Sequence, residues 1–217
     1  MTGTPAYAAT RALVVFVRAP ERGQVKTRLA ASIGADAALA AYRMLGTHVA
    51  RNVVPLSAST PPCTLIVAYT PDSPTAEAST RTWLGDAFTY EAQVAGDLGA
   101  RMAAAISARV AAGADAVVVI GADCPAVSAA TVERAFAALD GGADVVFGPA
   151  ADGGYYLVAL RRVYPELFTD VPWSSSHTLA VTLHRARSAG RRITFLDTEH
   201  DVDTAVEWDA WRGVGAR

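Results

Sequence analysis

Short apolar runs alternate with segments of helical periodicity along this chain, and that alternation restricts its fold more than any other feature. Ala116–Ile120 (AVVVI) is apolar at every position, as a central parallel strand covered on both faces should be. Ala12–Val17 (ALVVFV) is a similar run, and Asp36–Val53 places its apolar side chains on one stripe of a helix. Strands that alternate with helices in this way predict an α/β fold with a mostly parallel sheet.

The rest of the chain continues the alternation. We expect further strands at residues 64–69, 88–93, 144–148, 155–160 and 193–196, and further helices at 75–84, 97–112, 178–188 and 204–211, with another helix after Ser128. A turn containing Gly153 and Gly154, with no helix, separates the strands at 144–148 and 155–160, so we expect an antiparallel pairing near residues 144–160. The prediction is a Rossmann-like three-layer sandwich that forms one domain over residues 1–217, with residues 1–10 flexible.

Composition and charge narrow the class of partner. The net charge is -2 and the pI about 6.1, so the basic excess that a nucleic-acid surface needs is missing. Apolar runs stay far below the roughly 20 residues of a membrane span, and Met1–Thr10 has neither the basic nor the apolar region of a signal peptide. Two cysteines do not make a disulfide framework. We therefore expect a cytoplasmic protein with no nucleic-acid or membrane partner.

The loop after the first strand is rich in positive charge. Arg18, Arg22, Lys26 and Arg28 lie within eleven residues that also contain Gly23, and a helix is expected to begin inside the same segment. Backbone N–H groups, a helix N-terminus and full positive charges together favour phosphate binding. The GxxxxGK[ST] and GxGxxG patterns are absent, so neither a P-loop nor a dinucleotide fold is indicated. The alternative is a solvated basic loop without a ligand.

A single carboxylate follows the most strand-like run. Asp123, in Gly121-Ala-Asp-Cys-Pro125, comes directly after Ala116–Ile120, where a carboxylate can hold Mg²⁺ or Mn²⁺ against phosphate oxygens. Gly121 is expected beside the same phosphates. The alternative is that Asp123 only shapes a turn or caps the next helix, although Ser128 is better placed as that cap. Cys124 is expected to pack as a small apolar side chain.

Two aspartates come just after the last predicted strand. Asp201 and Asp203 are two residues apart, and in an extended segment that spacing puts both carboxylates on one side. The alternative is helix capping, because Thr204 and Glu207 have the spacing of a capping box. Capping explains Thr204 and leaves Asp201 without a role.

The glycine turn carries another candidate group. Asp152-Gly153-Gly154-Tyr155 sets a carboxylate and an aromatic ring beside a turn whose glycines allow a ligand to approach the backbone closely. A plain hairpin turn, in which tyrosines alternate across the strand, explains the segment equally well.

Two further segments contain candidate ligand-binding side chains. Gln93, Asp97 and Arg101 straddle a predicted helix N-terminus, where a substrate hydroxyl or phosphate could bind, although ordinary capping by Asp97 is at least as good an explanation. Trp173 and Ser174 lie in a polar loop that could line an acceptor pocket; the alternative is a surface loop ahead of a helix.

These segments together carry a family resemblance. A strand followed by Gly-Ala-Asp-Cys-Pro, with Gly-x-x-Lys-Thr-Arg-Leu after the first strand, resembles the nucleotide-diphospho-sugar transferase superfamily. Four more segments fit it: Gln93–Met102, Gly148–Tyr156, Leu167–Phe168 leading to Trp173–Ser174, and Asp201–Thr204. In more detail, the chain resembles the small bacterial glycosyltransferase-like family that is related to phospholactate guanylyltransferases. The resemblance covers nearly the whole chain.

The resemblance implies a GT-A-type fold and a nucleotide-using transferase. It also implies that the loop at Asp152–Tyr156 faces the acceptor or the nucleotide, and that the segment with Asp201 and Asp203 supplies a second metal ligand beside Asp123. Which of the two late aspartates serves stays open, and a homodimer is one assembly that we consider.

Two reactions fit these residues. In nucleotidyl transfer, an NTP lies with its phosphates against Lys26 and Arg28, the metal ion is held by Asp123 and a late aspartate, and a phosphorylated acceptor attacks the α-phosphorus. In glycosyl transfer, a nucleotide sugar uses the same metal site and Asp152 is the acceptor base. The basic loop favours the first reaction, because a triphosphate carries more negative charge. A third hypothesis is a nucleotide-binding protein without turnover.

Overall fold

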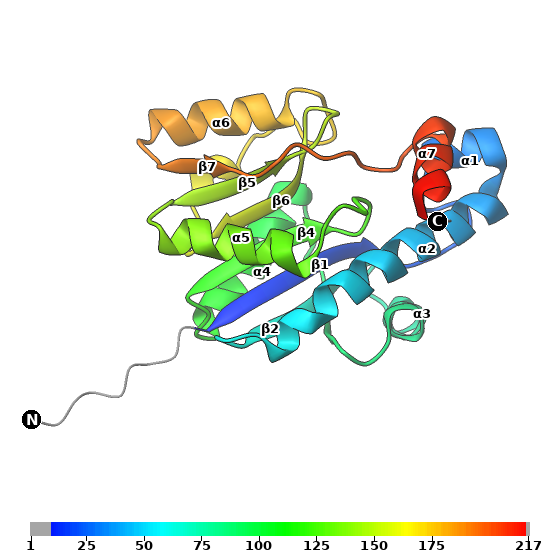
Figure 1. The fold of residues 1–217 in the computed structure, drawn as a ribbon, viewed down its shortest axis with the longest axis horizontal. Coiled ribbons are helices and arrows are strands. Elements are labelled where there is room, and N and C mark those ends of the chain that lie inside the picture. Colours follow the sequence, from blue (N-terminus) through cyan, green and yellow to red (C-terminus); the bar gives the residue numbers. More distant parts are fainter. Residues whose placement is uncertain (1–9, 216–217) are drawn as a thin grey trace, which may run out of the picture.

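The computed structural model describes residues 10–215, and its centre is one seven-stranded sheet (Figure 1). The strands are β1 (Arg11–Arg18), β2 (Cys63–Thr70), β3 (Thr89–Ala92), β4 (Ala116–Gly121), β5 (Val145–Pro149), β6 (Tyr155–Leu160) and β7 (Ile193–Phe195). Their order across the sheet is β3-β2-β1-β4-β6-β5-β7. The two runs that the sequence marks as most strand-like, β1 and β4, therefore lie side by side near the middle.

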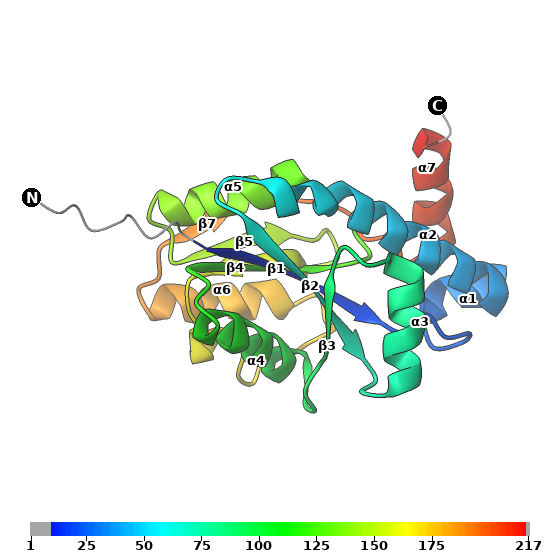
Figure 2. The ribbon, with the colours of Figure 1, turned by 90° about the horizontal axis from the view of Figure 1, so that it is seen from below.

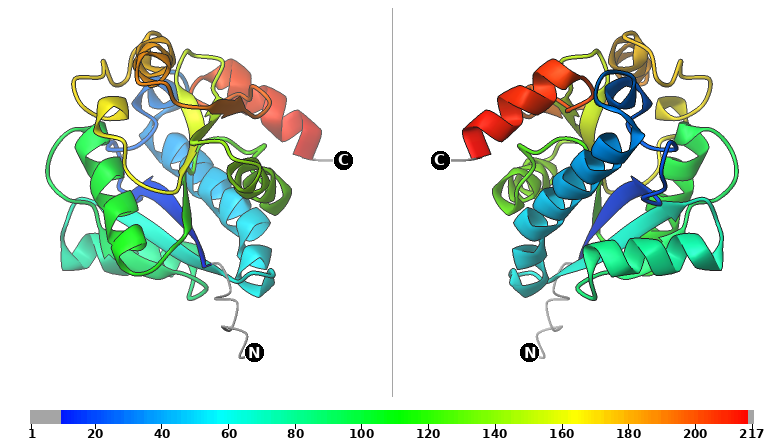
Figure 3. Two further views of the ribbon diagram at one scale, coloured as in Figure 1. Left: turned by 90° about the vertical axis from the view of Figure 1, so that its left-hand side faces the viewer. Right: turned by 90° about the vertical axis from the view of Figure 1, so that its right-hand side faces the viewer.

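Helices cover both faces of this sheet, as the alternation predicts (Figures 2 and 3). They are α1 (Thr27–Ile33), α2 (Ala35–Val53), α3 (Pro74–Leu84), α4 (Leu98–Ala111), α5 (Ala129–Asp140), α6 (Thr178–Ser188) and α7 (Ala205–Gly215), with short 3-10 turns η1 (Val54–Ala58) and η2 (Pro165–Leu167). Helices α2, α3 and α5 contribute to the core on one face, and α4 and α6 to the core on the other. The expected three-layer α/β sandwich is confirmed.

Strand direction also follows the prediction. β1 pairs in parallel with both β2 and β4, and β5 pairs in parallel with β7. β6 runs antiparallel to β4 and β5, because a tight turn rather than a crossover helix joins β5 to β6. The expected antiparallel pairing near residues 144–160 is therefore confirmed. Most strand and helix ends lie within one or two residues of the expected bounds, which is the ordinary uncertainty of element ends, but α7 continues to Gly215, beyond the expected end at residue 211.

Local capping explains where several helices begin. The Asp97 side chain accepts a hydrogen bond from Ala100 N at the start of α4, and Ser128 forms a capping box with Thr131 at the start of α5.

Cys124 is buried, and burial raises the pKa of its thiol to about 12, which agrees with its expected packing role. Of the segment that we expected to be flexible, residues 1–9 lie outside the described residues. Within residues 10–215, no helix is long and apolar enough to cross a membrane.

A small third core joins the two ends of the described chain. Leu29 of α1, Leu45 of α2 and Trp208 of α7 are buried together with Val202, which precedes α7. Figure 1 shows α7 (red) beside α1 and α2 (blue), at the end of the sheet toward which β1 points. This packing brings the segment that contains Asp201 and Asp203 to the carboxyl ends of β1 and β4.

Phe136 provides a test of the main core. Its ring is fully buried on α5 and packs against the sheet, so we expect Phe136→Ala to lower the free energy of unfolding by about 3–5 kcal/mol. Phe195→Ala is the matched control, because 44% of that phenylalanine is exposed on β7. Urea denaturation of both variants checks this expectation, and similar losses in the two would contradict the assigned core.

Candidate active site

Three segments that are far apart in the sequence converge at the carboxyl ends of the central strands. They are the loop between β1 and α1, the loop between β4 and α5, and the extended stretch before α7. A backbone bond from Val202 N to Asp123 O, 3.1 Å long, joins the second segment to the third. In an open α/β sheet, ligands bind at this edge.

Lys26 holds these three segments together. Its Nζ lies 3.0 Å from Asp123 Oδ1 and 2.8 Å from Asp203 Oδ1, so one ammonium contacts a carboxylate from each of the other two segments. Only 3% of the Lys26 side chain is exposed. Its backbone has a φ of 47°, in the left-handed region that few non-glycine residues adopt, directly ahead of α1. The loop accepts this conformation and thereby directs the ammonium inward.

The charge state of Lys26 follows from these contacts. Burial lowers the pKa of the ammonium, but the negative charges of Asp123 and Asp203 outweigh burial and raise that pKa above its ordinary value. Lys26 is therefore protonated at neutral pH and neutralises much of the charge of the two carboxylates.

Asp201 has no such partner. Its side chain takes part in no hydrogen bond or ion pair within residues 10–215, although Asp123, Asp203 and Asp152 are all close enough to affect its titration. Burial, together with the nearby charge of Asp123, raises the pKa of Asp201 to about 7. One oxygen of Asp123, Oδ1, is buried and has no hydrogen bond despite its ion pair with Lys26. Negative charge at this edge is thus only partly compensated.

A cavity of about 350 Å³ opens on the basic side of this cluster, and we name it the Arg18 cavity. Its charged side chains are Arg18, Lys26, Arg28, Asp123 and Asp203. The remaining lining residues are Phe16, Val17, Gln24, Val25, Thr27, Tyr42, Thr70, Gln93 and Leu98. The Arg28 side chain is 73% exposed at the mouth of this cavity, where one guanidinium nitrogen lies 3.9 Å from Asp203 Oδ2 and the rest of the group can meet an anion.

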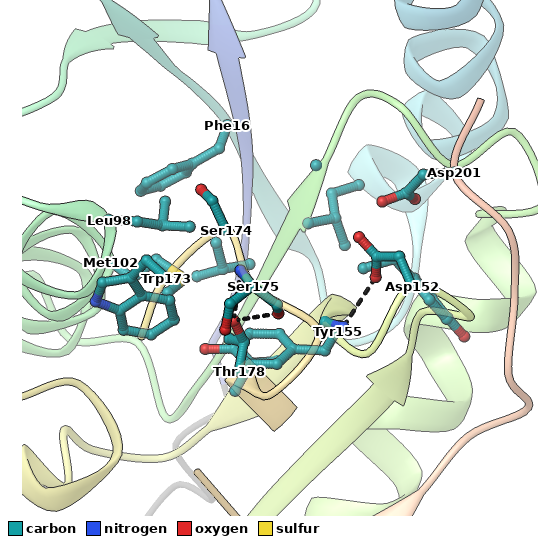
Figure 4. Close-up of a pocket in the computed structure, with 16 residues that line it drawn as sticks. Phe16, Leu98, Met102, Asp152, Tyr155, Trp173, Ser174, Ser175, Thr178 and Asp201 are labelled. Carbon is teal, nitrogen blue, oxygen red and sulfur yellow. Dashed lines mark hydrogen bonds between the residues drawn. The ribbon is translucent and has the colours of Figure 1, made fainter. Parts of the chain in front are cut away.

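A second cavity of about 220 Å³ opens on the other side, and we name it the Tyr155 cavity (Figure 4). Asp152 and Asp201 lie on one side of it, and Phe16, Leu98, Met102 and Trp173 on the other. Gly121, Gly154, Tyr155 and Ser174 also line it, together with Val119, Ile120, Tyr156, Val158, Ser175 and Thr178. Phe16 and Leu98 line both cavities, so the two spaces are neighbours.

Several side chains predicted as site residues lie elsewhere or are already engaged. Arg22 forms an ion pair with Asp36 outside both cavities, and Gly23 lines neither of them. Gln93 faces the Arg18 cavity, but its amide Nε2 donates to the carbonyls of Val17 and Ala68. The basic loop therefore offers fewer free cations than the sequence indicates.

Some of the predicted acceptor residues line the Tyr155 cavity, and others are engaged elsewhere. Asp97 is used as the cap of α4, and Arg101 donates to Gly96 O in a separate groove. Gly153, with a φ of 91°, lies beneath the Ser176 carbonyl, where an added Cβ would come within 2.1 Å of the oxygen. Gly121 faces the Tyr155 cavity rather than the cavity with the basic side chains. Thus Gly154, Tyr155, Trp173 and Ser174 are the predicted acceptor residues that do line a cavity.

Sequence reasoning missed Tyr42. Its hydroxyl accepts a hydrogen bond from Arg18 N and donates one to Arg18 O, each 3.0 Å long, so it fixes the end of β1 at the Arg18 cavity. Burial raises the pKa of this phenol, which remains a neutral donor. In the sequence, Tyr42 belongs to the apolar stripe of α2, and no local pattern distinguishes it from a core residue.

The carboxylates fit a divalent metal ion of a particular kind. Within the described part of the chain, no three Asp, Glu, His or Cys side chains come close enough together to form a complete metal site. Lys26 contacts Asp123 through Oδ1, however, and Asp201 has no partner in the described residues, so each of these two carboxylates keeps an oxygen that can accept a cation. Mg²⁺ commonly binds through one or two carboxylates, with substrate phosphates and waters completing its shell. The residues therefore fit a metal ion that arrives with a phosphate-bearing ligand.

The family is established by two comparisons. Residues 54–175 match the model of the family described as "Uncharacterized protein conserved in bacteria (DUF2064)". A provisionally assigned nucleotide-diphospho-sugar transferase from Desulfovibrio desulfuricans G20 is 31% identical, with a TM-score of 0.81 over 90% of this chain and 82% of that one. The chain belongs to the DUF2064 family, within the nucleotide-diphospho-sugar transferase superfamily. No curated protein matches it.

Two more distant structures share the fold. CMP:2-keto-3-deoxy-manno-octonic acid synthetase, solved with CTP, is 14% identical, with a TM-score of 0.59 over 96% of this chain and 99% of that one. Glucosyl-3-phosphoglycerate synthase from Mycobacterium tuberculosis, solved with Mn²⁺, UDP and glucosyl-3-phosphoglycerate, is 13% identical, with a TM-score of 0.56 over 97% and 76% of the two chains. The predicted superfamily and the coarse prediction of a nucleotide-using transferase are confirmed.

The bridging role of Lys26 can be tested through stability. Lys26→Met keeps the length of the side chain and removes its charge, leaving two carboxylates to face each other. We expect a loss of about 1–3 kcal/mol, less than for a fully buried pair because Asp123 and Asp203 are 41% and 38% exposed. Arg22→Met is the control, since its ion pair with Asp36 is fully exposed and its removal should change little. Equal unfolding curves for the two variants would contradict the bridge.

Proposed function

We propose that this protein is a metal-dependent nucleotidyltransferase that joins an NTP to a phosphorylated small-molecule acceptor. The observation that carries the proposal is the meeting of two neighbouring cavities at one cluster of carboxylates, with basic side chains in the first cavity and none among those lining the second. A transferase needs such an arrangement, because it must hold two substrates with their reacting atoms at one place.

The Arg18 cavity suits the nucleotide. Arg18 and Arg28 supply positive charge for phosphate oxygens at its mouth, and Lys26 lies at its inner end beside the carboxylates. Thr27 begins α1, so the positive end of that helix also faces the cavity. Because Arg22 and much of the Lys26 charge are neutralised by aspartates, the protein alone compensates a triphosphate only in part.

Asp123 and Asp201 are the proposed ligands of the metal ion. Both oxygens of Asp203 are near cations, Oδ1 at 2.8 Å from Lys26 and Oδ2 at 3.9 Å from Arg28, whereas Asp201 has no partner in the described residues. When bound, Mg²⁺ or Mn²⁺ would stabilise the negative charge on the phosphates.

In the proposed reaction, the protein mainly has to position the two substrates. A phosphate oxygen of the acceptor forms a bond to the α-phosphorus of the NTP, and the bond from that phosphorus to the oxygen bridging to the β-phosphate breaks, so that pyrophosphate leaves. Lys26 and Arg28 would hold the phosphates in line, and their charges would stabilise the leaving group. The acceptor would bind with its phosphate at the carboxylate cluster and its remaining part in the Tyr155 cavity.

Glycosyl transfer from a nucleotide sugar remains the second candidate, because Asp152 stands in the Tyr155 cavity as an acceptor base would. Among residues 10–215, its carboxylate is engaged through Oδ1 alone, by Gly154 N at 2.8 Å.

A thermal-shift panel separates these candidates. NTPs and nucleotide sugars are each added with and without Mg²⁺ or Mn²⁺, and a ligand that binds the native state raises the melting temperature. We expect one NTP to stabilise the protein, and only when metal is present. A nucleotide sugar that stabilises the protein while its NTP does not would favour glycosyl transfer. Binding of an NTP without turnover of any acceptor would favour a non-catalytic role.

Two neighbouring aspartates test the metal assignment. In the presence of the NTP found by the panel, we expect Asp201→Asn to weaken Mn²⁺ binding by about tenfold or more, without lowering the melting temperature, because Asp201 has no partner to lose. We expect the opposite for Asp203→Asn. It should lower the melting temperature, because Lys26 loses a partner, and should reduce the affinity for Mn²⁺ less than Asp201→Asn does. Electron paramagnetic resonance of free Mn²⁺ measures the affinity. The reverse order of effects would assign the metal to Asp203.

A further inference from the structure

The two cavities differ in the sign of their charge. Arg18, Lys26 and Arg28 face the first cavity, together with two carboxylates. In the Tyr155 cavity the charged side chains are Asp152 and Asp201, both acids. An anion therefore meets favourable charge in one cavity and repulsion in the other.

The acidic wall is held in place by its own backbone. Gly154 N donates to Asp152 Oδ1, and Leu179 N, in the first turn of α6, donates to Gly153 O at 2.9 Å. Gly153 also packs directly under the Ser176 carbonyl, so the turn has no room to move toward the Ser174–Ser176 loop. Figure 4 shows the carboxylates of Asp152 and Asp201 on the same side of the cavity.

Ser174 stands across the cavity from these carboxylates. Its φ of 59° is in the left-handed region, which non-glycine residues seldom adopt. In Figure 4 its side chain extends toward Phe16, which lines the same cavity. The cavity thus offers two carboxylates that accept hydrogen bonds and a hydroxyl that can donate or accept one.

We propose that the part of the acceptor that enters the Tyr155 cavity carries no negative charge and donates a hydrogen bond to Asp152; this inference rests on the proposed function of the site. A hydroxyl or an ammonium group can donate to the Asp152 carboxylate, and the Ser174 hydroxyl can donate to the first or accept from the second. A carboxylate has no proton to donate and would be repelled by the charge of Asp152. The acceptor is then a phosphate that bears a hydroxyl or an ammonium group rather than a phosphorylated carboxylic acid.

Three small phosphates of similar size test this inference by isothermal titration calorimetry. The probes are glycerol 3-phosphate, 3-phosphoglycerate and phosphoethanolamine, which end in a hydroxyl, a carboxylate and an ammonium group. Each is titrated into the full chain with Mn²⁺ and the non-hydrolysable analogue of the NTP found by the thermal-shift panel. We expect glycerol 3-phosphate and phosphoethanolamine each to bind at least tenfold more tightly than 3-phosphoglycerate.

Asp152→Asn is the paired variant. Asparagine keeps the oxygen that accepts from Gly154 N, so the turn is preserved while the charge is removed. We expect this variant to bind 3-phosphoglycerate more tightly than the wild type and so to narrow the difference between the two probes. Asp209→Asn, on the exposed face of α7, should leave all three affinities unchanged.

Each outcome has a distinct meaning. Binding of 3-phosphoglycerate by the wild type as tightly as or more tightly than glycerol 3-phosphate or phosphoethanolamine would overturn the inference, and so would the absence of binding by all three probes. The inference would also be overturned if Asp152→Asn left the difference in affinity between glycerol 3-phosphate and 3-phosphoglycerate unchanged. The charge of Asp152 would then not be the cause of that difference. Failure of the proposed nucleotidyl transfer would show itself separately, as stabilisation by a nucleotide sugar and not by an NTP in the thermal-shift panel.

Discussion

One buried ammonium organises the functional end of this molecule. Lys26 contacts Asp123 and Asp203 at 3.0 and 2.8 Å, and through them it joins the ends of β1 and β4 to the stretch before α7. A lysine that is 3% exposed is stable here only because the two carboxylates compensate its charge. The loop adopts a left-handed backbone at this residue to make the contact. The shapes and charges of both cavities follow, because their walls belong to the three segments that Lys26 connects.

The fold could be predicted because its determinants are local. The uninterrupted apolar run of β4 indicates a central strand, the turn at Gly153 indicates an antiparallel neighbour, and Asp97 and Ser128 mark the starts of their helices. Each of these signals acts within a few residues along the chain, where periodicity and capping decide the backbone. The loops that carry charged side chains could be found for the same reason, since they follow strands of a parallel sheet.

The partners of those side chains could not be predicted, because they depend on contacts between distant segments. Arg22 and Lys26 look alike in the sequence, yet one pairs with Asp36 at the surface and the other is buried between two aspartates. The amide of Gln93 is directed to backbone carbonyls of two strands rather than to a ligand. Tyr42 resembles a core residue until its hydroxyl is seen on Arg18. The free members of the site, Asp201 among them, become evident only after the engaged ones are identified.

The contact between Lys26 and Asp203, which lies beside the small core around Trp208, has a consequence for how this protein responds to its ligands. Lys26 and Asp203 are 177 positions apart, so their contact closes a loop that contains most of the described chain. A ligand bound by both segments would bind only the folded arrangement, in which that loop is closed, and would stabilise the native state by mass action. Occupancy of the site should then increase the stability of the whole sheet, including strands that line neither cavity. Resistance to proteolysis far from the site would thus become a measure of how much of the protein carries its substrate.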